Sequence, residues 1–569
     1  MSNRNNMIPI PGRLHSVAVG EPVSGADEVL DDALNMEQSE INQLTVGTKN
    51  ASTGTTGAYP YNGMGRVVLH KNMVNGVNTL TQDMLYKGDP GSRVPNTNTI
   101  FVIQYDFVLG EDITVPADCV LEFDGGSISG EHTITFNKTE LISPKFVNVT
   151  FAGTIKNHSV SAIGMGLDNT GTNDNSDILL SLLLILPLSG TELVFEGGTY
   201  NIVKRITVPN TQNPFFLSGS GSQSTIIKAT NANAGITFTN LLRSTIKDLH
   251  FDAGTFDRST PFVNVDNGVG IINVTTFHKC SFIGNKAFYS MFGGYCRFDE
   301  CTARISNPLA TDEYCIKLSG EYYYFNNCYI GETTFVGNNF PSILYLDRAS
   351  YVYIQNSDFC NTINGNAIKL KGCQHIFVKD TAMMRDTRLF DFDHSVAIID
   401  VDIKISIFDN KVIDKIIYAH KDSGTYGNLS NIKGLFFITG AAKNIETFDG
   451  PAINISSYNN CRFKYIYPYG YDITYPTSKD VILFYENSGY SGVITGTPSG
   501  DTPVLKILLS HKSPYTDITL PKASFSLFSG RPIEEYSFEN TFGGDCYLVV
   551  KTNGNLWTNS SYYLYDDFR

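Results

Sequence analysis

The feature that most constrains this chain is a six-residue pattern that recurs through its central part. In each copy an apolar residue is followed by two residues, a small or apolar residue, one more residue and a second apolar residue. Short strands of one pattern, joined by spacers of unequal length, are typical of a solenoid whose coils differ only in their loops. We therefore predict an all-β chain built around a right-handed parallel β-helix. The copies begin at residues 246, 277, 298, 325, 354, 378, 398, 432 and 458.

The pattern also predicts what fills the core of this β-helix. Alternation along a strand places the fourth and sixth residues of each copy on one face. The fourth position carries mostly small residues and the sixth carries mostly aromatic or branched side chains, so stacked coils should form ladders of like residues. We expect the thiols of the small-residue ladder to be reduced, buried and inert. These thiols belong to Cys280, Cys301, Cys328 and Cys461.

Charge and composition exclude several classes of function. The 569 residues carry a formal net charge of −14, whereas a nucleic-acid surface needs clustered Lys and Arg. Ten cysteines occur without a CxxC pair, and we expect neither a metal nor a cofactor. The longest apolar run, Ile178 to Leu188, is about half of the ~20 residues that a membrane-spanning helix needs. The polar start carries no secretory signal, so we expect no membrane insertion.

The region before the pattern divides into three parts. Residues 1–45 contain the clearest helical stretch of the first hundred residues, and 46–98 are rich in Gly, Thr and Asn, which predicts a linker. The strand patterns of residues 99–160 predict a β-rich entry module. Four apolar residues of the helix follow a heptad seam, which favours a homotrimer; a lone amphipathic helix that docks on a partner is the alternative. The seam residues are Leu30, Leu34, Ile41 and Leu44.

The remaining chain forms two further parts. We assign residues 161–475 to the parallel β-helix. Residues 476–569 carry new strand patterns separated by turn signals and include the only tryptophan, Trp557. A C-terminal β-sandwich-like or trimerisation domain is the predicted structure of this last part.

The entry to the β-helix carries a family resemblance. The Gly- and Asp-rich segment Gly164–Asp177 precedes a predicted helix at Ile178–Leu186 and a strand that ends in the turn 197–200, GGTY. This order resembles the entry segment of pectate-lyase-like phage tailspikes, and the resemblance implies a virion protein with a parallel β-helix. Asn175 stands where the family has the second residue of an Asp-Asp pair. We expect this departure to affect the geometry of the turn more than any chemistry.

A second resemblance lies near the N-terminus. Residues 11–16, PGRLHS, and 24–32, SGADEVLDD, resemble the leader of fibre and spike proteins from gut Bacteroidales phages, including crAss-like ones. The resemblance implies that residues 1–45 attach the chain to other tail or virion proteins. It also implies a location in the virion tail after assembly in the host cytoplasm. Neither resemblance identifies an enzyme.

Four carboxylates are the candidate catalytic residues. The pattern places them outward on three neighbouring coils, about 4.8 Å apart between coils and about 6.6 Å apart along a strand. These separations overlap the ~5 to ~9.5 Å between paired carboxylates in glycoside hydrolysis. Outward Asp residues that keep a β-surface soluble are the alternative, which applies equally to the group Asp391, Asp393 and His394. The four candidates are Asp358, Asp380, Asp400 and Asp402.

Tyrosines form the other candidate surface. An exposed tyrosine face can stack on sugar rings and bond to their hydroxyls, although a contact between sheets or subunits is the alternative. The predicted glycan-binding residues are Tyr329, Tyr351, Tyr353, Tyr465, Tyr467 and Tyr469.

Together these patterns predict a trimeric phage tail fibre or tailspike that attaches to a host-surface polysaccharide. A polysaccharide depolymerase, either a glycoside hydrolase or a lyase, is the alternative on the same scaffold. A purely structural fibre of head or tail is the third possibility. Fold alone does not decide among them, because function depends on the site, and enzymatic activity is therefore left open.

Overall fold

The computed structural model describes residues 65–87, 94–209 and 213–439, with short gaps in the last range, and isolated strands beyond residue 439. The leader, the seam residues Leu30, Leu34, Ile41 and Leu44, and His394 lie outside the described residues. The chain divides into two units, Met1–Ser220 and Gly221–Arg569. The gaps cover residues 266–270, 292, 306–313, 335–340, 364, 385–387, 394, 409–414 and 421–428.

Parallel pairing in the first unit begins upstream of residue 161. One stack consists of β1 (Gly65–Val68), β6 (Thr99–Ile103), β9 (Val120–Phe123), β11 (Thr133–Ile142) and β13 (Thr150–Ile155), each parallel to the next. These strands lie in the segments that the sequence assigned to a linker and an entry module. They lack the six-residue pattern, and they bury short apolar runs against one another, as Ile100, Val102 and Val120 do.

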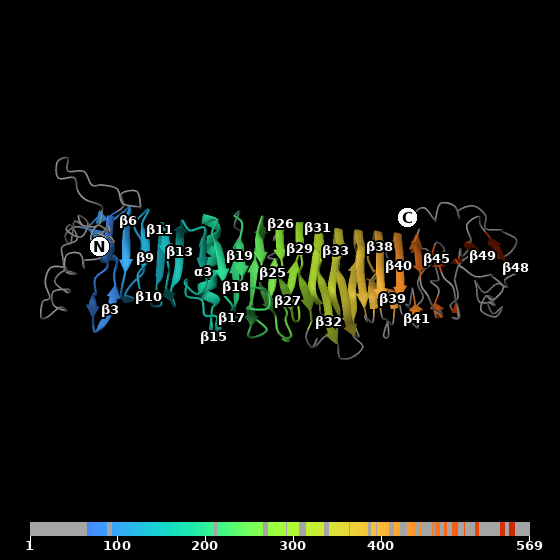
Figure 1. The fold of residues 1–569 in the computed structure, drawn as a ribbon, viewed down its shortest axis with the longest axis horizontal. Coiled ribbons are helices and arrows are strands. Elements are labelled where there is room, and N and C mark those ends of the chain that lie inside the picture. Colours follow the sequence, from blue (N-terminus) through green and yellow to red (C-terminus); the bar gives the residue numbers. More distant parts are fainter. Residues whose placement is uncertain are drawn as a thin grey trace, which may run out of the picture. The chain divides into compact units, whose positions relative to one another are not determined.

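The second unit confirms the predicted parallel β-helix. Strands from β20 (Thr225–Ala229) to β40 (Leu429–Thr439) pair in parallel with a strand of the next coil, and the successive strands lie side by side in Figure 1. Near the C-terminus the pairing changes, because β48 (Glu535–Asn540) and β49 (Asp545–Lys551) are antiparallel. The functional argument below concerns β40 and six further strands of the second unit. They are β26 (Ile271–His278), β29 (Gly293–Asp299), β31 (Tyr314–Asn326), β33 (Ser342–Gln355), β36 (Gln374–Met384) and β38 (Ile398–Phe408).

The core ladders form where the pattern predicts them. Phenylalanines of successive coils stack in parallel, with ring centroids 5.2 Å apart for Phe277 and Phe298 and 4.6 Å apart for Phe298 and Phe325. Cys280, Cys301 and Cys328 are free and buried. Their thiols donate to backbone carbonyls one coil earlier, for example from Cys328 Sγ to the oxygen of Phe298 at 3.1 Å. The side chain of Cys461 lies outside the described residues.

The register expected at residue 398 is wrong. Val378 begins one copy of the pattern and pairs with Ile403, not with Ile398. The cause is the sequence of β38, IIDVDIKISIF, in which every second side chain from Val401 to Ile407 is buried and the residues between them are not. Such an alternating strand fits the six-residue pattern in more than one register, and the pattern alone cannot choose between them.

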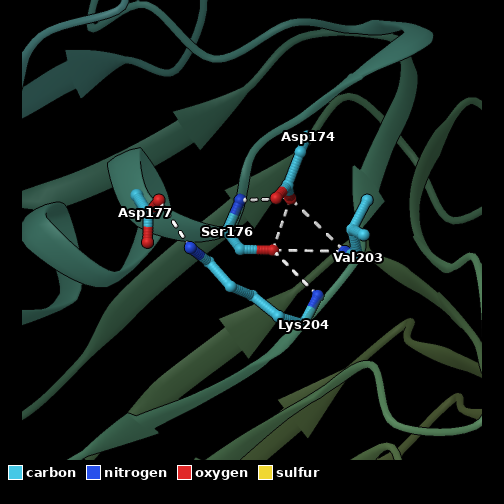
Figure 2. A network of polar contacts seen from close by, with 5 residues as sticks. All are labelled: Asp174, Ser176, Asp177, Val203 and Lys204. Carbon is cyan, nitrogen blue, oxygen red and sulfur yellow. Dashed lines mark hydrogen bonds and ion pairs between the residues drawn. The ribbon is translucent and has the colours of Figure 1, made fainter. Parts of the chain in front are cut away.

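The predicted helix is present and longer than expected. It is α3 (Ser176–Ser189), it ends at Gly190 in the left-handed conformation, and it packs against β13. Asp174 accepts a hydrogen bond from the backbone N–H of Ser176 at 2.8 Å, and Ser176 Oγ accepts one from that of Val203 at 3.1 Å (Figure 2). These contacts fasten the first helical turn to the following coil. Among the described helices, none has the length and apolar character to cross a membrane.

The departure at Asn175 has a structural reason. Its buried amide bonds twice to the backbone of Asp168, accepting from the N–H at 2.7 Å and donating to the carbonyl oxygen at 2.9 Å. A carboxylate has no donor for the second bond. Asn175 therefore sets the geometry of the entry turn.

Replacing Asn175 by Asp should destabilise the entry turn. The carboxylate would face the carbonyl oxygen of Asp168 with no donor, and an unsatisfied buried polar group costs about 1–3 kcal/mol. Chemical denaturation should show a loss of this size, and Asn137→Asp, at an exposed position, should change the free energy of unfolding by less than ~0.5 kcal/mol. Equal stability of the two variants would contradict this role of the amide.

Replacing Cys328 by Ser should be tolerated. The new hydroxyl would find the carbonyl of Phe298 in reach, and the next two residues of the ladder, Ser357 and Thr381, already donate to carbonyls two residues earlier at 2.8 and 3.0 Å. We expect a change in the free energy of unfolding below about 1.5 kcal/mol.

Labelling of the native thiols checks their burial. Burial raises the pKa of Cys373 to about 12, and only the thiolate reacts. Modification of the described cysteines should therefore require unfolding, and rapid labelling of the native chain would contradict it.

Candidate functional site

Seven described residues form a row along one corner of the second unit. Each has a left-handed backbone with φ between 50° and 61°. The residues on either side of them pair in register from coil to coil, so the seven lie one above another. This backbone costs a residue other than Gly about 1–2 kcal/mol. The members of this corner row are Val274, Tyr295, Tyr322, Tyr351, His375, Asp400 and Asn431.

Aromatic rings stack along the corner row. Ring centroids lie 4.7 Å apart between Tyr295 and Tyr322, 4.8 Å between Tyr322 and Tyr351, and 4.6 Å between Tyr351 and His375. The first two pairs are within 9° of parallel, and the third is tilted by 21°. The spacing matches the distance between coils, about 4.8 Å.

A second row lies two residues further along the same strands. Tyr324 stacks on Tyr353 and Tyr353 on Phe377, both with centroids 5.0 Å apart. We call the five tyrosines of the two rows the tyrosine array. Its members are Tyr295, Tyr322, Tyr351, Tyr324 and Tyr353.

The stacking decides which atoms the tyrosine array presents. Neighbouring rings cover each other's faces, so the array exposes ring edges and phenol hydroxyls, and a free face remains only where a row ends. Tyr295, the first tyrosine of the corner row and the neighbour of Val274, is 53% exposed. Partial burial and the neighbouring phenols Tyr295 and Tyr351 raise the pKa of Tyr322. A protonated phenol both donates and accepts hydrogen bonds.

The corner row continues beyond the tyrosines as a chain of polar contacts. His375 Nδ1 lies 3.3 Å from Asp400 Oδ2, and Asn431 Nδ2 donates to Asp400 Oδ1 at 2.8 Å. The side chains of His375 and Asp400 are 32% and 37% exposed. The imidazole therefore has one face against Tyr351 and one nitrogen against a carboxylate.

Lysines and carboxylates alternate beside this chain. Lys379 pairs with Asp402 at 3.1 Å, and Lys404 lies 4.0 Å from Asp380. Lys379 and Lys404 are direct neighbours on adjacent coils. The surface next to His375 thus carries both signs of charge.

The four predicted catalytic carboxylates do not form one stripe. Asp358 pairs across coils with Ala382, and Asp380 occupies a separate left-handed turn with a φ of 49°. Asp400 lies in the corner row, and Asp402 lies beside Phe377. The expected acid/base separation depended on the register at residue 398, which is wrong. Asp400 instead lies against the imidazole of His375.

Only some of the predicted glycan-binding tyrosines belong to the tyrosine array. Tyr351 and Tyr353 belong to the tyrosine array, whereas Tyr329, on β32 (Tyr329–Thr334), pairs with Thr302 and Asp358 outside it. The side chain of Tyr465, and Tyr467 and Tyr469 altogether, lie outside the described residues.

Sequence reasoning missed Tyr295 and His375. It noticed the run from Tyr322 to Tyr324 but did not place Tyr322 and Tyr324 among the glycan-binding residues. Along the chain, the steps from Tyr295 to Tyr322, to Tyr351 and to His375 are 27, 29 and 24 residues. These steps equal those between the pattern copies at 298, 325, 354 and 378, because each corner residue stands three positions before a copy. A search for residues at a constant offset from the pattern would have found them.

A second polar group lies on β35 (Asn366–Lys371) and β37 (Arg388–Asp393). Asp391 is buried and accepts a hydrogen bond from Asn366 Nδ2 at 2.7 Å, and the buried Asp393 pairs with Lys371 at 2.8 Å. Their pairing with neighbours indicates a structural role for these two buried carboxylates. Within the described residues no three His, Cys, Asp or Glu side chains are grouped so as to hold a metal ion.

The parallel pairing of successive coils defines a parallel β-helix protein. No protein-family model and no curated protein matches the chain. Among solved structures it is similar to the catalytic domain of a GH87 alpha-1,3-glucanase in complex with nigerose, at 13% identity and a TM-score of 0.38, over 66% of this chain and 67% of that one. A mannuronic acid specific polysaccharide family 6 lyase from human gut microbiota matches at 10% identity and a TM-score of 0.34, over 66% and 90%. At these values the likeness carries no argument about chemistry.

Replacing Tyr322 by Ala should destabilise the corner row. The change removes two ring contacts, each worth about 0.5–1.5 kcal/mol beyond simple burial, so we expect a loss of about 1–3 kcal/mol in chemical denaturation. Tyr322→Phe keeps both stacked contacts and should stay within ~0.5 kcal/mol of the unaltered chain. An alanine variant as stable as the phenylalanine variant would show that the stacking contributes nothing.

Proposed function

We propose that this chain binds an extended polysaccharide along the tyrosine array. The observation that carries the proposal is the regular presentation of one partly exposed phenol per coil over three successive coils of the corner row, with a second row beside it. A polysaccharide presents hydroxyls at regular intervals along its length. Phenol groups at a fixed spacing can donate to and accept from such hydroxyls.

The residue types at the corner support this proposal. A left-handed backbone favours Gly or Asn, yet three consecutive positions carry Tyr and the next carries His. Stacking offsets part of the steric cost, but stacking alone does not require hydroxyls at the edge. Lys379 and Lys404, beside the array, each lie against a carboxylate, that of Asp402 and that of Asp380. This pairing suits a sugar better than a nucleic acid, which needs clustered cations.

We further propose that the chain acts as a trimeric tail fibre or tailspike that attaches a phage to a host-surface polysaccharide. The proposal is supported by the leader-like segments 11–16 and 24–32, by the seam residues from Leu30 to Leu44, and by the parallel β-helix itself. Residues 1–45 would hold the fibre to the virion, and the tyrosine array would contact the host.

Cleavage of the bound polysaccharide is the second candidate function. The proximity of His375 and Asp400 in the corner row favours it, because imidazoles and carboxylates are the groups that most often serve as general acids and bases. A purely structural fibre would bind no sugar at all, and the binding test below separates it from the other two.

The double variant Tyr351→Phe with Tyr353→Phe tests the proposed binding. Each phenol hydroxyl that bonds a sugar contributes about 0.5–1.5 kcal/mol, so two should weaken affinity by about 5- to 150-fold. Calorimetric titration with host capsule or surface polysaccharide would measure the loss. The stacking of the rings in the tyrosine array stays intact in this variant, so its free energy of unfolding should be unchanged.

Tyr329→Phe is the matched control for this binding test. Tyr329 is 37% exposed but lies outside the tyrosine array, so its variant should bind as the unaltered chain does. An unaltered chain that binds no surface polysaccharide would refute the proposed function. Equal affinity of the double variant and the unaltered chain would refute the tyrosine array as the binding surface.

A further inference from the structure

An arginine lies in line with the tyrosine array. Along β29 the side chains of Cys296 and Phe298 are buried, whereas those of Tyr295 and Arg297 are exposed. Arg297 pairs in register with Tyr324 on the next coil, and Tyr324 pairs in the same way with Tyr353. Arg297 therefore extends the second row of the array by one coil, beside the exposed Tyr295 of the corner row.

The charge of Arg297 acts on the phenols of the array. Partial burial and the phenols of Tyr353 and Tyr295 raise the pKa of Tyr324, while the positive charge of Arg297 acts in the opposite direction. Both exposed side chains of β29 therefore influence the same phenol, which belongs to the next coil about 4.8 Å away. A ligand that bonds to the hydroxyl of Tyr324 also lies near the guanidinium.

Arg297 differs from the lysines of the same face in having no carboxylate partner. Lys379 lies 3.1 Å from a carboxylate oxygen of Asp402, and Lys404 lies 4.0 Å from one of Asp380. The guanidinium of Arg297 forms neither a hydrogen bond nor an ion pair with any residue that the structure describes. Since a guanidinium has five N–H donors, these donors are left for a ligand.

The protein's own carboxylates favour a ligand anion at this end of the second row. Asp299 lies two positions further along β29, about 6.6 Å along the strand, and within the described residues it forms no ion pair with Arg297. In the other direction the row reaches Asp402, which lies against Lys379 and pairs in register with Lys433. The lysines there already face a carboxylate, whereas the guanidinium at β29 does not.

A carboxylate fits the position of Arg297 better than a neutral hydroxyl does. A guanidinium binds a carboxylate through two parallel hydrogen bonds, and such charge-assisted bonds are stronger than those between neutral groups. A uronic acid carries this carboxylate on a sugar ring, next to hydroxyls that phenols can bond. One arginine among tyrosines also falls short of the clustered cations that a nucleic acid needs.

We propose that the tyrosine array binds an acidic polysaccharide and that Arg297 holds the carboxylate of one of its uronic acid units. Tyr295 and Tyr324 bond to hydroxyls near that carboxylate, and the other tyrosines bond to units further along the row. An acidic polysaccharide thereby gains a contact that a neutral one lacks. This inference rests on the proposed function, to which it adds the class of polysaccharide.

The test uses one polysaccharide in two forms. The host-surface polysaccharide that the full-length chain binds is titrated calorimetrically, first as isolated and then after chemical reduction of its uronic acid carboxyl groups to alcohols. The reduced form keeps the ring hydroxyls and loses the charge. Because hydrogen bonds to charged groups contribute more than those between neutral groups, reduction should weaken binding by about 10- to 150-fold.

Arg297→Gln should reproduce this loss. It should weaken binding of the untreated polysaccharide by a similar factor and leave the affinity for the reduced form unchanged, because the carboxylate is already absent there. Arg297→Lys keeps the charge but loses the two parallel bonds, so its affinity should be intermediate. The side chain is exposed and has no partner among the described residues, so the free energy of unfolding should stay the same in both variants.

Arg304 offers a matched control. It is exposed and ends β30 (Thr302–Arg304), the strand that follows β29 in the chain, outside the tyrosine array. Arg304→Gln removes the same charge and should bind both forms of the polysaccharide as the unaltered chain does. If general attraction to a positive charge were responsible, the variants at 297 and 304 would lose affinity equally.

The outcomes separate this inference from the proposed function. Equal affinity for the two forms overturns the inference and leaves the proposed function standing, also where sulfate or phosphate groups of the polysaccharide attract Arg297 instead. A loss on reduction that Arg297→Gln does not reproduce, or that Arg304→Gln matches, overturns the assignment to Arg297. A chain that binds no host-surface polysaccharide overturns the proposed function itself, and this inference with it.

Discussion

The in-register stacking of parallel coils is the constraint on which the rest of this structure depends. Because residues at one position lie directly above one another about 4.8 Å apart, each position becomes a row that runs through many coils. Inside, the rows are ladders of phenylalanine and of small residues such as Cys301, Ser357 and Thr381. Outside, the same rule arranges tyrosines and their polar successors. Core and surface therefore follow one geometric rule, and a change at one step of a row acts chiefly on the steps above and below it.

The corner row shows how this rule arranges residues with a strained backbone into a regular surface. Seven residues, one on each of seven successive coils, hold a left-handed backbone that only Gly adopts without steric cost. Parallel stacking of Tyr295, Tyr322 and Tyr351 stabilises the same residues that the backbone strains. The consequence differs from the expectation of sugar rings lying on tyrosine faces. Ring faces are used within the protein, so a ligand meets edges and hydroxyls, and recognition depends on hydrogen bonds at a fixed spacing.

The sequence predicted the class of fold because the six-residue pattern records which side chains must enter the core. It did not predict the coils before residue 161, since strands such as β6 and β9 bury apolar runs without that pattern. It also failed at residue 398, where the alternation in β38 fits several registers. The contact of His375 with Asp400 depends on that register, because the two residues lie 25 positions apart in the chain and become neighbours only when Ile376 pairs with Val401. Candidate carboxylates could thus be named from the sequence, but their partners could not.

A row of equally spaced residues also separates the groups that would bind the polymer from the groups that could react with it. Hydrogen bonds from Tyr295 and Tyr322 would hold a glycan equally well before and during reaction, so they would raise affinity without raising kcat. Only groups further along the row, His375 and Asp400, would meet charge that develops if the bound polymer were cleaved. A long binding row with a single reactive step suits a protein that must remain attached to a polymer while it alters it. In such a protein the length of the row sets how tightly the polymer is held, and the last step sets whether it is changed.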